Sequence, residues 1–260
     1  MCLVAIAWRV HPRWPLALIA NRDEAHARPS VPAGFDPDAP AVYGGRDLVQ
    51  GGSWLQASRG GRLAAVTNIR GPAPATAPPD SRGWLVRDFM RGHGDAGAHL
   101  EALSPRADRC GPFNLLACDG SALYAASNHP RYAAGPVDAG LHAMSNGAFD
   151  APSPKAVFAT RALGAWLESP LGGIAEPDMA SIEPLFTALR DTTPAPDALL
   201  PDTGVGIDLE RRLSPPFVLD PVYGTRCSSV VLAGADGVLF AERRYDADGR
   251  PAGTTLAWLR

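Results

Sequence analysis

The chain has 260 residues, of which 46% are hydrophobic and 20% charged, a composition typical of a globular protein with a substantial core. Its 24 basic and 27 acidic side chains give a net charge of -3 and form no block, which argues against binding to nucleic acid or an anionic membrane. Arg9, His11 and Arg13 interrupt the first apolar run, which therefore fits neither a membrane span nor a signal peptide. We expect a single domain over residues 1–260, located in the cytoplasm.

The first half of the chain predicts strands followed by one helix. The predicted strands lie at residues 2–8, 15–20, 51–56 and 60–68, which would form two hairpins. Residues 28–40 are rich in proline and aspartate and predict a surface loop. Apolar residues at helical spacing predict a helix that begins near Ser81.

The second half predicts strands at both ends with helices between them. Asp119-Gly120 is a favoured hairpin dipeptide and separates strands predicted at 113–118 and 122–126. Helices are predicted at 155–167 and 182–190, with Ser153-Pro154 and Ser181 as their starts. The last predicted strands lie at 229–233, 237–244 and 254–259. This order indicates an α+β sheet protein whose N-terminal strand is internal and whose helices cover one face of a sheet.

The cysteines and histidines lack the spacing of a disulfide framework or a metal site. Four cysteines lie far apart without a CxxC pair, and six histidines form neither HxH nor HExxH. We therefore predict reduced thiols, no metal and no required cofactor. Cys227 is expected to be buried and unreactive, and His26 is the one histidine placed to take part in a site.

Cys2 follows Met1 directly, which gives it a special chemistry if Met1 is removed. Its thiol, with a pKa near ~8.5, would then share a residue with a free α-amine of pKa near ~7.7 to 8.0, a nucleophile with its own base. The alternative is a small buried hydrophobe in a first strand, which position alone favours. Retention of Met1 would convert the amine of Cys2 to an amide and move the free amine by up to ~3.6 Å.

Four polar residues, Asn21-Arg22-Asp23-Glu24, follow the second apolar run, where we expect the strand to leave the core. In a hairpin they would lie across from the Cys2 strand. The carboxylate of Asp23 could then hold the amine, and the guanidinium of Arg22 could lower the thiol pKa or bind an acyl oxygen. A solvated charged turn is the alternative.

Two asparagines and one arginine also stand at predicted strand ends. Asn68 and Asn146 could donate hydrogen bonds to an oxyanion, although Asn146-Gly147 is also ordinary turn chemistry. Arg226 precedes the C-terminal strands and could add a cation to the same cleft or pair with a surface acid.

Taken together, these segments resemble the NRDE family, the transport and Golgi organisation protein 2 family, which is named for the run at residues 21–24. The resemblance runs in family order through further blocks: Met1-Cys2 and residues 27–29, 51–55, 61–68, 113–115, 145–146 and 223–226. Ser53, Gln56 and Cys227 depart from the family pattern of Thr, Gly, and Ser or Thr. The first two departures fall in a loop that could shape substrate access.

That family is similar to N-terminal nucleophile hydrolases of the penicillin acylase and bile-salt hydrolase type. The resemblance implies a four-layer αββα sandwich of two antiparallel sheets. It matches Cys2 to the nucleophile and assigns the remaining site positions to Arg22, Asp23, Asn68, Asn146 and Arg226. Arg22 and Asp23 match the basic and acidic pair, the two asparagines the oxyanion and substrate-holding amides, and Arg226 the distal arginine.

Two functions follow as hypotheses. In the first, Cys2 attacks the carbonyl of a linear or cyclic amide, the α-amine carries the proton, Asp23 orients that amine, and the asparagines steady the oxyanion. In the second, which the resemblance implies, the scaffold is non-catalytic and handles haem, lipid or acyl-CoA, with Cys2 as a ligand to haem iron or a structural residue. The expected partner is a small-molecule amide or a haem or lipid ligand, without nucleic acid or stable membrane insertion.

Overall fold

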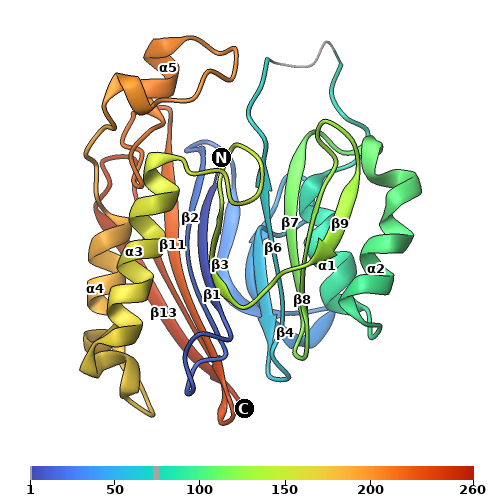
Figure 1. The fold of residues 1–260 in the computed structure, drawn as a ribbon, viewed down its shortest axis with the longest axis vertical. Coiled ribbons are helices and arrows are strands. Elements are labelled where there is room, and N and C mark those ends of the chain that lie inside the picture. The colour runs from blue at the N-terminus through green and yellow to red at the C-terminus, as the bar shows by residue number, and fades with distance from the viewer. Residues whose placement is uncertain (1, 73–75) are drawn as a thin grey trace.

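Two β-sheets packed face to face, with helices on both outer faces, make up the four layers seen in Figure 1. The computed structural model describes residues 2–72 and 76–260, without the side chain of Cys2. The neighbouring strands of both sheets are antiparallel. The expected α+β, four-layer αββα sandwich is therefore confirmed.

The first sheet contains strands from both halves of the chain. In spatial order its strands are β10 (Gly140–Met144), β1 (Cys2–Trp8), β2 (Leu16–Ala25), β11 (Tyr223–Gly234), β12 (Gly237–Tyr245) and β13 (Pro251–Leu259). β1 is internal, as predicted, because β10 pairs with one side of it and β2 with the other. The predicted C-terminal meander is confirmed in β11, β12 and β13.

The second sheet follows chain order from one edge to the other. Its strands are β3 (Ser30–Asp36), β4 (Ala39–Asp47), β5 (Leu55–Ser58), β6 (Arg62–Asn68), β7 (Phe113–Asp119), β8 (Leu123–Ser127) and β9 (Ala133–Pro136). The predicted hairpins β5–β6 and β7–β8 are confirmed. The surface loop predicted at 28–40 is wrong, because most of it forms β3. Pro32 argues against a strand in the sequence, but β3 accommodates a proline because it is an edge strand with a bulge.

Helices pack on the outer face of each sheet. The α-helices are α1 (Arg82–Arg91), α2 (Ala96–Leu103), α3 (Pro154–Glu168), α4 (Met179–Leu189) and α5 (Ile207–Arg212). Three short 3₁₀ helices span Ser104–Arg109, Pro170–Gly173 and Asp197–Leu199. In Figure 1, α3 and α4 cover the first sheet, and α1 and α2 cover the second. Among the described residues no helix combines the length and apolarity needed to cross a membrane.

The core has three clusters that follow the alternation of the strands. In β1 and β2, Val4, Ile6 and Leu18 face the second sheet, whereas Leu3 and Ile19 pack against α3 and α4. A third cluster lies between the second sheet and helices α1 and α2. Both faces of each sheet are thus covered, and polar side chains that remain buried need specific partners.

The strand β2 is longer than predicted. It continues through the Asn21-Arg22-Asp23-Glu24 run to Ala25, so the run does not mark the point where the strand leaves the core. Asn21 is buried, and its side-chain amide donates to the carbonyls of Leu189 and Pro216. The polarity of the run is typical of a strand end, but pairing with β11, which the local sequence does not show, keeps it in the sheet.

Candidate functional site

A cleft with a volume of about 730 Å³ opens between the sheets near the ends of β2 and β6. Arg22 and Asp23 line it from the first sheet, and Asn68 lines it from the second. Three of the predicted site residues therefore line one opening, although Arg22 and Asn68 are 46 positions apart in the sequence.

The backbone of Cys2 lies beside this cleft, at the start of β1. Cys2 pairs with Arg22 in the ladder to β2. On the other side of β1, the ladder to β10 ends at the pair Val4–Met144, and Asn146 follows two residues after the end of β10. Met1 and the side chain of Cys2 lie outside the described residues, so the predicted pair of thiol and α-amine is not placed. Buried Arg22 nevertheless lies directly across the sheet from Cys2.

The guanidinium of Arg22 is buried and lies against an aromatic ring. Arg22 is 5% exposed, stacks over the ring of Trp54 at 4.3 Å from its centroid, and lies 3.7 Å from the carboxylate of Glu24. Among the described residues its Nη1 has no hydrogen-bond partner. A buried cation with an unused donor can bind an acceptor atom of a ligand.

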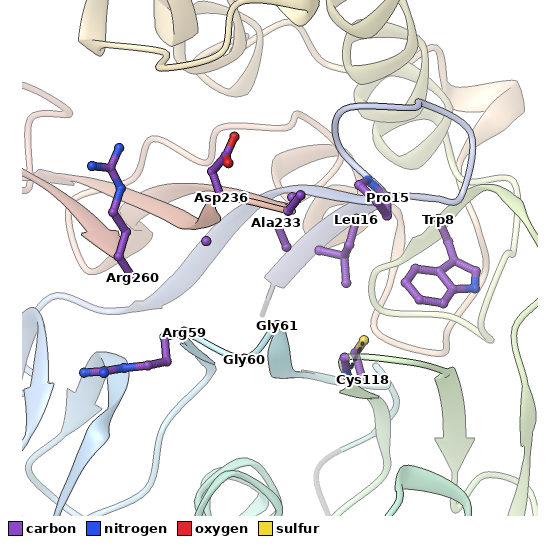
Figure 2. Close-up of a pocket in the computed structure, with 14 residues that line it drawn as sticks. Trp8, Pro15, Leu16, Arg59, Gly60, Gly61, Cys118, Ala233, Asp236 and Arg260 are labelled. Atoms are coloured by element: carbon purple, nitrogen blue, oxygen red, sulfur yellow. Dashed lines mark hydrogen bonds between the residues drawn. The ribbon is translucent and has the colours of Figure 1, made fainter.

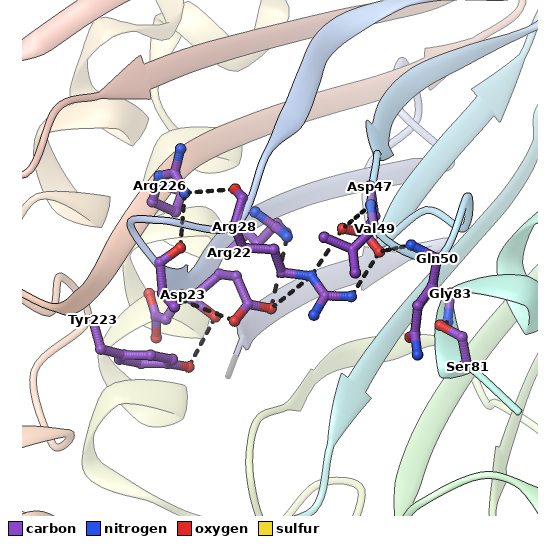
Figure 3. Close-up of polar contacts among 12 residues, drawn as sticks. Arg22, Asp23, Arg28, Asp47, Val49, Gln50, Ser81, Gly83, Tyr223 and Arg226 are labelled. Carbon is purple, nitrogen blue, oxygen red and sulfur yellow. Dashed lines mark hydrogen bonds and ion pairs between the residues drawn. The ribbon is translucent and has the colours of Figure 1, made fainter. Parts of the chain in front are cut away.

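Asp23 is held in a fixed orientation by residues of β11. It is 1% exposed, and its Oδ1 accepts a 2.7 Å hydrogen bond from the hydroxyl of Thr225. The hydroxyl of Tyr223 donates to its main-chain carbonyl at 2.9 Å (Figure 3). Because Arg22 and Asp23 are both buried, the alternative of a solvated charged turn is wrong for this pair.

The two predicted asparagines are bonded to each other. The Nδ2 of Asn146 donates to the main-chain oxygen of Asn68 at 3.2 Å and to its Oδ1 at 3.1 Å. The Oδ1 of Asn146 accepts from Arg70 at 3.1 Å and from Lys155 at 3.2 Å. Since cations only donate, these contacts fix which end of the Asn146 amide is oxygen. Both N–H groups of Asn146 are thus directed at Asn68.

The cations behind Asn146 form a network that sequence reasoning missed. Lys155, at the start of α3, is 5% exposed and also donates to the carbonyl of Leu213. Arg70 forms a buried ion pair with Glu210 of α5, which also accepts from the hydroxyl of Thr203. The partners lie up to 140 positions apart, so no local signal in the sequence marks them.

Arg226 and His26 build the rim of the site. Arg226 does not line the cleft, and its Nη1 donates to the carbonyls of Ala25, His26 and Arg28 (Figure 3). Burial and the nearby Arg22 lower the pKa of its guanidinium. His26 contacts the carbonyl of Asp220 through Nε2 at 3.0 Å. Among the residues that the structure describes, Arg226 thus neither lines the cleft nor forms an ion pair with a surface acid, and its guanidinium fixes the loop that follows β2.

Arg28 and Asp47 join the two sheets across the rim. Arg28 donates through Nε and Nη2 to the two carboxylate oxygens of Asp47 at 2.8 and 2.7 Å (Figure 3). This bidentate bond raises the pKa of the Arg28 guanidinium. Burial alone would raise the pKa of the Asp47 carboxyl, but the bonds from Arg28 and from the amide of Gln50 outweigh it and lower that pKa. Sequence reasoning missed Asp47 because it lies outside the predicted strands.

A second hollow, of about 460 Å³, lies at the other end of β1, where Trp8 lines it together with Cys118 and Arg260 (Figure 2). Trp8 lies six residues along β1 from Cys2, which at about 3.3 Å per residue places this hollow roughly 20 Å from Cys2. Burial raises the pKa of the Cys118 thiol to about 11, so this sulfur is a poor nucleophile at neutral pH. The polar groups that suit acyl chemistry gather at the Cys2 end of the sandwich.

A family profile described as Transport and Golgi organisation 2 matches residues 1–247. The chain belongs to this family. Two curated relatives, each called Transport and Golgi organization protein 2 homolog, come from Bos taurus and Homo sapiens. Each is 30% identical over 263 residues, covering 94% of this chain and 92% of the relative. The NRDE resemblance expected from the sequence is confirmed.

Solved structures with the same fold are N-terminal nucleophile hydrolases. A Caenorhabditis elegans N-acylethanolamine-hydrolyzing acid amidase ortholog is similar with a TM-score of 0.52 and 11% identity, covering 98% of this chain and 100% of that one. A C2A mutant of conjugated bile acid hydrolase from Clostridium perfringens is similar with a TM-score of 0.55 and 6% identity, covering 100% and 92%. At these identities the similarity establishes the fold.

The departures from the family pattern occupy different places. Ser53 lines the cleft, and its hydroxyl donates to the carbonyl of Gly45 at 2.6 Å. Gln56 lies within β5, is 2% exposed and does not line the cleft. Cys227 is buried, as predicted, on β11 beside Arg22. Of the two changes expected to shape substrate access, only Ser53 is placed to do so.

Proposed function

We propose that this chain is an N-terminal cysteine amidohydrolase that cleaves a small-molecule C–N amide bond once Met1 has been removed. The observation that carries the proposal is the pairing of Cys2 with buried Arg22, at the wall of a cleft that Arg22, Asp23 and Asn68 line. The hydrolase fold of the similar structures supports the same reaction class.

The asparagines have different roles in this proposal. Asn146 directs both N–H groups at Asn68, and therefore holds Asn68 in place. Because the Oδ1 of Asn68 accepts from Asn146, its Nδ2 is turned away from that bond, and no described residue accepts from it. Asn68 lines the cleft and is thus the donor for a developing oxyanion, while Asn146 is a positioning residue.

The reaction then proceeds in two halves. The thiol of Cys2 gives its proton to the free α-amine, and the sulfur attacks the amide carbonyl carbon. The tetrahedral oxyanion is stabilised by Asn68, and the amine leaves with the proton carried by the α-amine, so that a thioester remains. Water attacks the thioester, the α-amine takes and returns the proton, and a carboxylic acid and the free thiol are formed.

Arg22 and Asp23 prepare the nucleophile in this scheme. A buried guanidinium on the residue paired with Cys2 favours a thiolate over the neutral thiol. The carboxylate of Asp23, fixed by Thr225, favours the orientation of the α-amine needed for proton transfer. Arg226 acts through the rim loop and is a positioning residue.

The test is turnover by mature protein whose mass shows the loss of Met1. A panel of fluorogenic acyl amides is assayed with the natural chain, Cys2→Ala and the control Cys118→Ala, which removes a buried thiol at the opposite end of the sandwich. We expect hydrolysis by the natural chain and the control, and none by Cys2→Ala. Turnover retained in Cys2→Ala would overturn the proposal.

The second candidate is a non-catalytic carrier of haem, lipid or acyl-CoA on the same scaffold. The names of the curated relatives, which refer to transport and Golgi organization, favour it. Under this candidate, haem titrated into the protein would show saturable binding that Cys2→Ala abolishes, and the amide panel would give no turnover. Turnover without saturable binding would favour the hydrolase.

A further inference from the structure

A smaller cavity of about 220 Å³, here called the Leu213 pocket, adjoins the cleft. Arg70 lines both cavities. Asn146 lines the Leu213 pocket and is hydrogen-bonded to Asn68, which lines the cleft. The hydrogen-bonded group of Arg70, Asn146 and Asn68 is therefore the wall shared by the two cavities, and the reaction proposed above makes no use of the space behind it.

The Leu213 pocket changes from apolar and exposed to polar and buried along its length. Leu199, at 61% exposure, Leu200 and Pro201 form its outer end. Leu213, at 4% exposure, and Lys155, at 5%, lie at its inner end with Asn146. A ligand that matches this gradient has an apolar body and one polar end, and its polar end lies innermost.

The inner end of the pocket lies beyond the end of β10, which pairs with β1. Asn146 follows two residues after β10 ends, and Lys155 bonds to this Asn146. Of the described residues that line the pocket, Arg70 and Lys155 are cations and Glu210 is the one carboxylate. A pair of cations favours an oxygen that carries negative charge, such as an amide carbonyl in reaction or the carboxylate of an acid product.

We propose that the Leu213 pocket binds a short apolar acyl group, with the acyl carbonyl at its inner end and the amine half of the amide in the larger cleft. The assignment of the carbonyl to a reacting amide rests on the proposed function, whereas binding of the acyl group does not. The substrate class is then an amide of a short aliphatic acid with a larger, polar amine.

The volume of the pocket sets the length of the acyl group. If each non-hydrogen atom occupies about 30 Å³, as a water molecule does in the liquid, a cavity of 220 Å³ holds roughly seven such atoms. A hexanoyl group has this number of non-hydrogen atoms. Each methylene removed from water up to that length strengthens binding about fourfold. Methylenes beyond hexanoyl would pass exposed Leu199 into solvent and add little.

The experiment measures chain-length dependence in two ways. Hydrolysis of a series of amides from acetyl to dodecanoyl, all with one amine, gives kcat/KM for the mature chain. Binding of the matching free carboxylates to the inactive Cys2→Ala protein is measured by calorimetry. We expect both quantities to rise about fourfold per methylene from acetyl to hexanoyl, on the order of 100-fold in all, and then to level off.

Two variants test the location of the acyl group. Leu200→Trp and Leu199→Trp place a large ring inside or at the mouth of the Leu213 pocket, and we expect the advantage of hexanoyl over acetyl to disappear. Leu199 is exposed, so its variant retains the fold if Leu200→Trp does not. The control is Ile207→Trp on α5, which is 50% exposed and lines neither cavity.

The outcomes separate this inference from the proposed function. Length-dependent carboxylate binding that the Leu200→Trp or Leu199→Trp change removes, without amide hydrolysis, supports the pocket and contradicts the hydrolase. Hydrolysis by Cys2 with no dependence on acyl length, or with gains that continue through dodecanoyl, supports the hydrolase and overturns the pocket. An unchanged length dependence in both tryptophan variants also overturns it.

Discussion

Asn68 and Asn146 carry the same side chain but differ in what surrounds them. Two cations fix the oxygen of Asn146, and its nitrogen donates to Asn68. Asn68 lines the cleft, and no described residue accepts a hydrogen bond from its nitrogen. In the proposed reaction, two residues that look equivalent in the sequence thus take different roles, one as the donor for the oxyanion and one as the residue that orients it.

Substitution of the two asparagines should give different signatures. In Asn68→Ala we expect kcat to fall about 100-fold to 1000-fold, because an oxyanion donor is lost, and stability to fall less than in Asn146→Ala, because the main-chain oxygen of residue 68 still accepts from Asn146. In Asn146→Ala we expect a smaller fall in kcat and a loss of about 1–3 kcal/mol in the free energy of unfolding, because buried Lys155 loses an acceptor. Steady-state kinetics and urea unfolding measure both. Equal losses of kcat with unchanged stability would contradict this division.

Glu242 predicts a pH dependence of stability. Burial between the sheets raises the pKa of its carboxyl, and the hydrogen bonds from the amide of Ala33 and from Cys227, with the charges of Arg244 and Arg22, counteract this only in part. The folded state therefore holds this proton more tightly than the unfolded state, whose carboxyl titrates near ~4.3, and the stabilisation is lost as pH rises from there through the folded-state pKa. We expect Glu242→Gln to raise the free energy of unfolding at pH 8 and to change it little at pH 4. A variant that is less stable at pH 8 than the natural chain would contradict this.

At the scale of elements, the ends of the helices show which local signals are sufficient. Ser81 and Ser153-Pro154 mark the starts of α1 and α3 as predicted, and the hydroxyl of Ser81 accepts from the amide of Gly83. The start of α4 is Asp178 rather than Ser181, and its carboxylate accepts from the amide of Ser181. A carboxylate in this position caps the helix and also favours its dipole.

The serine and aspartate N-caps of α3 and α4 offer a matched pair of substitutions. Asp178→Ala removes a capping bond and should lower the free energy of unfolding by about 1 kcal/mol. Ser153 makes no side-chain capping bond, so Ser153→Ala should be close to neutral. Asp178→Asn, which keeps an acceptor, should recover most of the loss. Urea unfolding of the three variants tests this, and a larger loss in Ser153→Ala than in Asp178→Ala would contradict it.

At the scale of the whole molecule, the sequence predicts the layers better than the site. The alternation in β1 and β2 and the hairpins of the second sheet follow from local pattern, and family resemblance supplies the order of the layers. Because of Pro32, the sequence predicts a loop where β3 lies, and because residues 21–24 are polar, it predicts too early an end for β2. These errors arise where pairing between distant strands outweighs local propensity.

The site needs contacts that only the folded chain creates. Trp54 reaches Arg22 from the opposite sheet, and Arg70 meets Glu210 across 140 positions. Arg226, which the family pattern places in the site, turns its guanidinium to the loop after β2. Residue types and strand positions are therefore enough to predict which residues gather at the cleft. The direction of each side chain depends on the packing of both sheets and is not predicted.

The most direct measurement is the site of acylation in mature protein. The chain is mixed with an activated hexanoyl amide, quenched in acid, and mapped by peptide mass spectrometry under conditions that preserve thioesters. We expect an N-terminal peptide that begins at Cys2 and carries one hexanoyl group on sulfur, released as hexanoate when the quench is delayed. A turnover-competent protein whose N-terminal peptide still begins with Met1, or whose acyl group lies on Cys110, Cys118 or Cys227, would contradict it.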